Sequence, residues 1–472
     1  MNMMEKWLLL PGDPRREKKI AAILPAICLL GLVVFSFYLC LQEISSIKSE
    51  NQFLRMDARE YISLADNLYE GKGYRMSEGL CVTSGGTAFR APGYPVFLLL
   101  FRWLYGKDKF LMAVILYQNL FFCLLPLIFY WLTFNVSSSR LLSLFSAFLS
   151  VFFEPLRIMA NIIHPESLAF FLLLLALGFL FSYLGAKRTT KLLAFSIFLA
   201  SAVMVKQNLV LVLLVFLFPL PLMLKRKATI IAFIFPLLFF SAWLVRNSLV
   251  LHKFPVFSTI TGLSFYLGNN PAVRMDMSNV TGYKSTMNDL FKQGMTEVEA
   301  DRQLWKKGIL FIKDKGLIWY FYRMRGKISV LFRDYYPLAK NGIFFGLLPF
   351  AFLMKKRRRA LVLLIILQIM YAFFIYAPRF SLYDLSLAGV LDVAILNLFG
   401  IGSLLVLAWG KNMKALLVVV TYLLILLPMI ITIPSDRDKI VCDALLIIGY
   451  ALAPMVLKEM VASPLPDFKT DD

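Results

Sequence analysis

Two short polar segments carry the residues of this chain that are best suited to chemistry. Asp57, Glu60 and Tyr61 lie close together in one segment, and Arg90 follows in Phe89-Arg-Ala-Pro. Hydrophobic stretches long enough to cross a membrane lie on both sides of the region 43–109 that contains them. A carboxylate at the mouth of an apolar cavity can have a raised pKa and act as an acid or a base. Asp57 is therefore the candidate catalytic residue.

Further polar residues recur at the ends of apolar segments along the chain. They are His164, Glu166, Lys206, Arg246, Asn247 and Arg379. Ionisable groups at membrane depth cost free energy and usually face a bundle interior or a cavity. The three basic residues are suited to binding a phosphate, because cations form strong hydrogen bonds with anionic oxygens. The pattern predicts a polar cavity that opens outward and holds an anionic lipid headgroup.

Each of these residues also fits a purely structural role. Asp57 and Glu60 have the spacing of a helix capping box. Glu166 follows a proline and could begin a helix as a first-turn acid. The three basic residues could reach lipid headgroups from the ends of membrane spans. Spacing alone leaves both interpretations open.

The composition places the chain among polytopic membrane proteins. Of its 472 residues 59% are hydrophobic, which is more apolar surface than a soluble protein could bury. Nearly uncharged windows predict about 12 transmembrane helices. They are expected at 20–42, 110–133, 141–160, 167–185, 192–206, 209–224, 228–250, 341–354, 360–377, 386–409, 415–434 and 440–457. The expected fold class is all-α, with one transmembrane domain over 1–457 and a cytoplasmic tail over 458–472.

The basic residues indicate an orientation in the membrane. The net charge of +21 does not predict binding to nucleic acid, because Lys and Arg cluster in short loops between spans. If the N-terminus is cytoplasmic, all the basic clusters in short loops fall inside, except the mixed run Asp436-Arg-Asp-Lys439. Regions 43–109 and 251–340 are then long extracytoplasmic loops. Both termini are expected in the cytoplasm, and the polar residues are expected to face the periplasm or the exterior.

Cysteine and histidine usage limits the kinds of site. Four of the five cysteines lie in or near apolar spans, so no disulfide framework is predicted. Two histidines exclude a multi-histidine metal site. A divalent cation near Asp57 and Glu166 is compatible with the residues, but the ligand set is too sparse to predict one. No cofactor is expected to be required.

Several motifs resemble those of integral membrane C-type glycosyltransferases. Asp57-x-x-Glu-Tyr61-x-x-Leu64-Ala65-x-Asn67-Leu68, followed by Arg90-Ala-Pro92-Gly-Tyr-Pro95, is similar to the first outer loop of family 39. That family includes the protein O-mannosyltransferases and the lipid A aminoarabinose transferases. Later motifs resemble it at Pro165-Glu166, Val205-Lys206, Arg246-Asn247, Gly268-Asn-Asn-Pro271 and Arg379-Phe380. The resemblance covers most of residues 20–395.

The resemblance implies the GT-C fold, with juxtamembrane helices in the first extracytoplasmic loop. It also implies transfer of a sugar from a polyprenyl-phosphate donor to an extracytoplasmic acceptor, with inversion at the anomeric carbon and Asp57 as the general base. The donor-binding residues implied are Glu166, Lys206, Arg246, Asn247, Arg379, Arg90 and Tyr61. The acceptor is left open between protein, lipid and glycan.

Two alternatives remain beside this interpretation. One is a polysaccharide polymerase or ligase that also uses a polyprenyl-linked glycan. The other is a secondary transporter or flippase of lipid-linked glycans. Transporters often contain inverted repeats, and we detect no internal repeat in this sequence.

Overall fold

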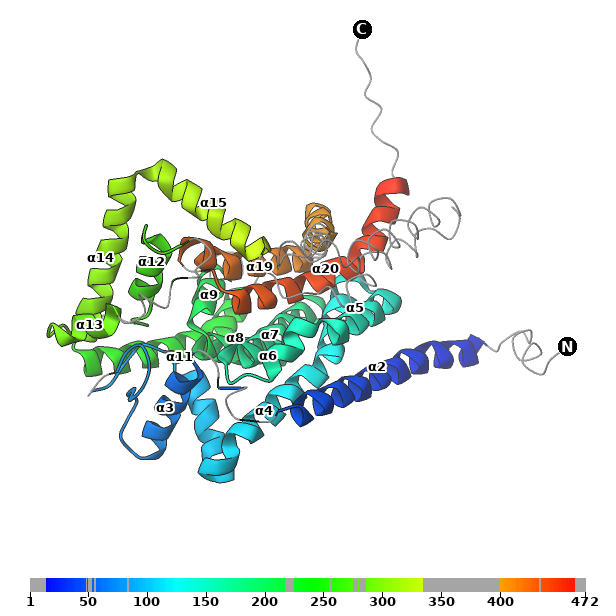
Figure 1. Ribbon diagram of the computed structural model, residues 1–472. Coiled ribbons are helices and arrows are strands. Elements are labelled where there is room, and N and C mark those ends of the chain that lie inside the picture. Colours follow the sequence, from blue (N-terminus) through cyan, green and yellow to red (C-terminus); the bar gives the residue numbers. More distant parts are fainter. Residues whose placement is uncertain are drawn as a thin grey trace, which may run out of the picture.

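The computed structural model is built from helices that cross and cap a single bundle (Figure 1). It describes residues 14–333 and 399–462, apart from 48, 50–52, 55–56, 83–84, 217–224, 254–256, 275–278, 280–285 and 433. Within these residues all regular secondary structure is helical. The predicted spans 341–354 and 360–377, and Arg379, lie outside the described residues.

The long helices confirm the prediction of an all-α polytopic membrane protein. In the described part of the chain, six helices are long and apolar enough to cross a membrane. They include α2 (Pro14–Ser45), α4 (Gly93–Ser137), α7 (Pro165–Ala186), α11 (Arg226–Leu251), α19 (Met413–Ile431) and α20 (Asp436–Ala462). The shorter apolar helices α5 (Arg140–Phe152) and α8 (Thr189–Val205) complete the bundle, with α5 against α4 and α8 against α7. The total of about 12 spans stays a prediction.

Two predicted spans differ from the observed helices. The span expected at 141–160 is divided into α5 and the short helix α6 (Glu154–Ala160). Phe153, the junction residue, precedes Glu154-Pro155, and a proline nitrogen cannot donate the hydrogen bond that would continue α5. The span expected at 209–224 begins with η2 (Gln207–Leu209) and α9 (Val210–Phe216), beyond which the residues are not described.

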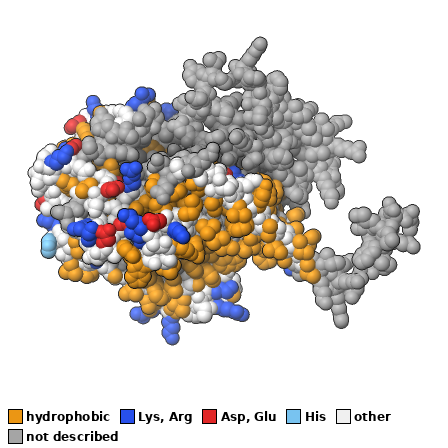
Figure 2. Space-filling view, turned by 60° about the horizontal axis from the view of Figure 1, so that its bottom comes forward, with side chains coloured by type: hydrophobic (Ala, Val, Ile, Leu, Met, Phe, Trp, Pro, Cys, Tyr) orange, Lys and Arg blue, Asp and Glu red, His pale blue; other side chains and the backbone are white. Residues whose placement is uncertain are grey.

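The lipid-facing surface and the interior of the bundle belong to different helices. Only 11% of the apolar window of α2 is buried, whereas 94% of that of α20 is buried. Figure 2 shows a broad band of hydrophobic side chains across one face of the molecule, as expected of a surface in contact with lipid. Because α20 lies inside the bundle, Asp438 and Lys439 near its start are buried.

The helices outside the bundle gather at one of its ends. These are α3 (Ala58–Tyr69), α12 (Thr261–Asn269), α13 (Thr286–Lys292) and α14 (Glu297–Lys315), followed by α15 (Leu317–Arg333) (Figure 1). Within region 251–340, α14 and α15 form one nearly continuous helical stretch. It is broken at Gly316, whose φ of +84° favours glycine. Thr296 and Glu299 form a capping box at the start of α14.

One buried carboxylate joins the two long loops. Glu297 accepts a hydrogen bond from the backbone nitrogen of Ala88 at 2.9 Å and another from the hydroxyl of Thr259. One turn later, Asp301 accepts a hydrogen bond from the backbone nitrogen of Gly262 at 2.6 Å. The first turns of α14 therefore fix the first loop against α12.

Candidate functional site

A group of charged side chains lies where α3, α7, α8 and α20 begin or end. The Nζ of Lys206 is 2.8 Å from Glu166 Oε1 and 2.7 Å from Asp438 Oδ1. Arg437 lies between two acids, 3.2 Å from Asp57 Oδ2 and 3.5 Å from Glu166 Oε1. We call the following residues the charged cluster: Asp57, Glu60, Arg90, His164, Glu166, Lys206, Arg437 and Asp438.

Arg90 connects the first loop to the charged cluster. Its guanidinium donates to Glu60 Oε2 through two nitrogens, at 2.5 and 2.7 Å, and lies 3.2 Å from Asp57 Oδ2. The other oxygen of Glu60 accepts a hydrogen bond from the backbone nitrogen of Leu80 at 2.9 Å. The ring of Tyr61 lies 5.2 Å from the Arg90 guanidinium carbon, within range of a cation–π contact.

The capping-box interpretation of Asp57 and Glu60 is wrong. Asp57 precedes the first residue of α3, but its side chain makes no capping hydrogen bond, and Glu60 accepts two hydrogen bonds from Arg90. A buried guanidinium competes for these carboxylates more strongly than a backbone N–H, because both partners are charged. The two acids therefore belong to an ion network rather than to a helix cap.

The backbone explains why these residues meet. Pro165 occupies the first position of α7, so Glu166 lies in the first turn, where the positive end of the helix dipole stabilises a carboxylate. Asp438 lies in the first turn of α20 in the same way. Lys206 follows the last residue of α8 in an extended conformation (φ −136°, ψ 111°). Opposite charges thus converge from helix ends.

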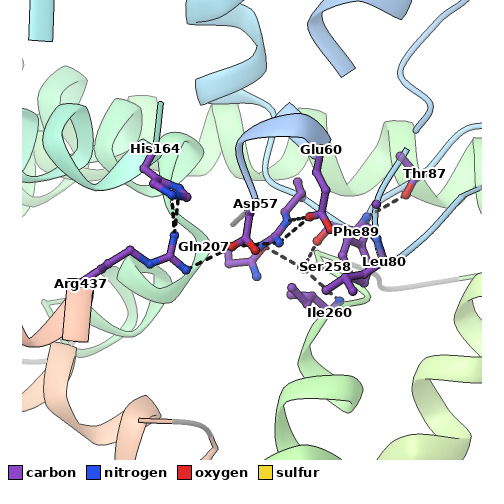
Figure 3. A network of polar contacts seen from close by, with 12 residues as sticks. Asp57, Glu60, Leu80, Thr87, Phe89, His164, Gln207, Ser258, Ile260 and Arg437 are labelled. Carbon is purple, nitrogen blue, oxygen red and sulfur yellow. Dashed lines mark hydrogen bonds and ion pairs between the residues drawn. The ribbon is translucent and has the colours of Figure 1, made fainter. Parts of the chain in front are cut away.

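His164 holds the other side of Arg437. The Arg437 NH1 atom lies 2.9 Å from Nδ1 of His164, and Figure 3 shows Arg437 reaching from α20 toward both His164 and Asp57. Burial lowers the pKa of His164 to about 4, so at neutral pH its ring is uncharged and can accept this hydrogen bond. Arg437 is thereby positioned by a neutral partner and two acids.

The pKa of Asp57 differs from the expectation that burial would raise it. Burial does act in that direction, but the charges of Arg90 and Arg437 outweigh it and hold the pKa of the Asp57 carboxyl below its usual range. Asp57 is therefore ionised at neutral pH in the protein without substrate. It can accept a proton, but while both guanidinium groups remain in place it is a weak base.

Arg246 and Asn247 stabilise the first loop. Arg246 donates to the backbone oxygen of Thr87 at 2.6 Å and to that of Tyr74 at 3.2 Å, and it lies over the ring of Trp243. Asn247 is buried and accepts a hydrogen bond from Arg246 at 2.8 Å. None of the Arg246 contacts described here reaches the charged cluster. The role predicted for both residues in donor binding stays a prediction, as does that of Arg379.

Two members of the charged cluster were not predicted from the sequence. Arg437 and Asp438 belong to the mixed run that was the exception to the distribution of basic residues. An Asp-Arg-Asp-Lys run at the start of a long apolar span is itself unusual, because charges at that depth need partners. That signal could have identified them.

An apolar pocket borders the charged cluster. Residues of α4, α6, α7 and α20 line it, including Phe121, Leu125, Leu156, Phe170 and Val441, and Glu166 contributes to the same wall. The arrangement places hydrocarbon-compatible surface directly beside a carboxylate–cation network. The cavity is small, about 20 Å³, which is close to the space that one water molecule needs. A ligand with an apolar chain and an anionic head would lie along these side chains rather than inside the cavity, with its head at the network.

The described residues contain no group of three or more His, Cys, Asp or Glu side chains that could hold a metal ion. Between the carboxylates lie Arg90, Lys206 and Arg437. Each of these cations pairs with two of the carboxylates.

The chain is distantly similar to several solved structures, among them the following two. No protein-family model and no curated protein sequence matches the chain. An oligosaccharyltransferase from Archaeoglobus fulgidus, tethered to an acceptor peptide, is similar over 92% of this chain at 12% identity, with a TM-score of 0.47. ArnT from Cupriavidus metallidurans, bound to undecaprenyl phosphate, is similar over 91% of the chain at 12% identity, with a TM-score of 0.37. The chain spans 50% of the oligosaccharyltransferase and 78% of ArnT.

Proposed function

We propose that this protein is a membrane glycosyltransferase of the GT-C type. It transfers a sugar from a polyprenyl-phosphate donor to an extracytoplasmic acceptor. The observation that supports this most directly is the charged cluster beside the apolar pocket. Buried charges of both signs are costly in a hydrophobic bundle, and they are typical of a site that handles a charged substrate.

The donor matches the two surfaces of the site. Its polyprenyl chain lies along the apolar side chains that border the small pocket, and its phosphate is bound by Lys206 and Arg437 at the pocket's edge. During transfer the bond between the anomeric carbon and the phosphate oxygen breaks, and its electrons stay on the phosphate. The two cations stabilise the negative charge that develops there.

Asp57 is the carboxylate that an acceptor can reach. Its side chain is 18% exposed, compared with 4% for Glu60, 3% for Glu166 and 7% for Asp438. The acceptor hydroxyl attacks the anomeric carbon from the face opposite the phosphate, and its proton passes to Asp57. A single displacement of this kind inverts the configuration at that carbon.

The orientation follows from the distribution of basic residues. With the short basic loops and both termini in the cytoplasm, the charged cluster faces the periplasm or the exterior. A lipid-linked sugar supplies an activated donor at that face. Protein, lipid and glycan acceptors all offer the hydroxyl that the reaction needs.

The test is transfer from a radiolabelled polyprenyl-phosphate hexose by purified protein in detergent, with envelope extracts as the source of acceptor. Asp57→Asn should reduce transfer by about 10²–10⁴-fold, because the general base is lost. The matched control is Asp66→Asn on the same helix, whose carboxylate pairs with Arg102 at 2.8 Å outside the charged cluster.

Normal turnover by Asp57→Asn would remove Asp57 from the role of base. Movement of the labelled donor across liposomes without any product would identify a flippase instead. Polymerised product in place of single-sugar transfer would identify the polymerase alternative.

A further inference from the structure

Arg437 has the longest ion pair and the most exposed side chain of the three cations in the charged cluster. Its contacts with Asp57 and Glu166 measure 3.2 and 3.5 Å, whereas Lys206 lies 2.7 and 2.8 Å from its two acids. Its side chain is 26% exposed, compared with 13% for Lys206 and 9% for Arg90. Of the three cations, Arg437 can therefore change partners at the lowest cost.

The charged cluster has no spare positive charge for an incoming phosphate. Its three cations face four carboxylates, and His164 is neutral because burial lowers its pKa. A phosphodiester adds a further negative charge to a site that already has one excess acid. A cation that binds the phosphate must therefore give up part of its interaction with a carboxylate.

We propose that Arg437 transfers from Asp57 to the donor phosphate, so that donor binding prepares Asp57 to accept the proton of the acceptor. This inference rests on the proposed function and adds an order to it, in which the donor binds before the acceptor can react. Arg437 is then a switch between an empty site with a weak base and a donor complex with a stronger one.

The groups around Asp57 determine whether its pKa rises or falls when Arg437 moves to the phosphate. The titratable and charged groups around it are Arg90, Glu60 and Tyr61 from the first loop and α3, His164 and Glu166 at the start of α7, Lys206 after α8, and Arg437 and Asp438 of α20. When Arg437 leaves and a phosphate arrives, only Arg90 remains in direct contact. Burial and the phosphate charge then both raise the pKa of Asp57.

Linkage provides a test that needs no acceptor. If donor binding raises the pKa of Asp57, the complex binds more protons than the free protein, and affinity falls as the pH rises through that pKa. The probe is radiolabelled farnesyl methyl phosphodiester, which carries one negative charge throughout the range. Its binding to the full-length protein in nanodiscs is measured between about pH 5 and pH 8.

The wild type should bind the probe more weakly at the higher pH, and Asp57→Asn should show no such dependence. Arg437→Met should bind about 10–100-fold more weakly, because a charge-assisted hydrogen bond to the phosphate is lost. Arg437→Lys keeps the charge and should retain the pH dependence. Arg102→Met is the control. It removes a buried arginine that pairs with Asp66 of α3 and should behave as the wild type.

Each contrary result overturns a different statement. Wild-type binding that does not change with pH, or an unchanged dependence in Asp57→Asn, overturns the proposal for Arg437 while sugar transfer remains intact. Wild-type affinity in Arg437→Met overturns it as well, as does an equal loss in Arg102→Met. Failure of the wild type to bind the probe at any pH refutes the proposed function itself.

Discussion

Replacement of Lys206 by methionine should destabilise the protein by about 3–5 kcal/mol, although the side-chain volume hardly changes. Lys206 lies 2.8 Å from Glu166 and 2.7 Å from Asp438, and both acids are almost completely buried. At an effective dielectric constant of about 20, each contact supplies roughly 6 kcal/mol of attraction. Most of this attraction offsets the free-energy cost of moving three charged groups out of water. Without the ammonium group, two buried carboxylates keep that cost: Asp438 loses its ion pair with Lys206, and Glu166 is left with Arg437 at 3.5 Å.

Unfolding can be followed with the protein's own cysteines. Cys40, Cys81, Cys123 and Cys442 are buried and free, so a thiol-reactive fluorophore reports their exposure as SDS is added to mixed micelles. Lys206→Met should unfold at a lower SDS fraction than the wild type. Adding Glu166→Gln to Lys206→Met should recover part of the lost stability, because one uncompensated charge is removed. The coupling free energy between the two substitutions should be about 0.5–3 kcal/mol.

The control is Lys187→Met at the other end of α7, where the side chain is exposed and lies over the ring of Tyr183. It should change stability by less than about 1 kcal/mol. Equal stability of Lys206→Met and the wild type would refute the reasoning, since Glu166 and Asp438 could then not depend on Lys206.

Two further predictions concern the two long loops. Arg246→Met should destabilise the first loop by about 1.5–3 kcal/mol per hydrogen bond lost to Thr87 and Tyr74, seen as faster proteolysis between residues 74 and 90 with the bundle intact. Burial raises the pKa of Asp301 from 3.8 to about 7. The stability that the protonated carboxyl contributes is therefore complete below pH 3.8 and is lost as the pH rises through about 7. Asp301→Asn should abolish this pH dependence in the amide exchange of α12, and an unchanged profile would assign it to another group.

The membrane-spanning helices could be predicted from the sequence where the length of an apolar stretch determines them. The spans at 167–185 and 228–250 correspond to α7 and α11, because an uncharged stretch of that length is stable only in a membrane or a core. The division of 141–160 at Phe153 was not predicted. A proline can either bend a helix or end it, and the packing around it decides which occurs.

The site residues could be predicted where an ionisable side chain lies at the end of an apolar segment or in the polar region next to it. Asp57, Glu166 and Lys206 were expected at one face, and the structure brings them into one network with Arg437. Arg437 itself was missed, because a guanidinium at the start of a span has no visible partner in the sequence. Its pairing with Asp57 joins residues 380 positions apart, and no local pattern reports a contact of that range.

Arg437 and Asp438 lie near the C-terminal end of the sequence, and this position has a consequence for biosynthesis. A ribosome completes Asp57, Glu166 and Lys206 long before it reaches α20, so the nascent protein inserts into the membrane with an incomplete ion network. Arg90 can meet Asp57 early, and Lys206 can meet Glu166, but each pair gains its further partner only from α20. Because α20 adds one cation and one acid, its arrival leaves the net charge of the site unchanged and completes its connections.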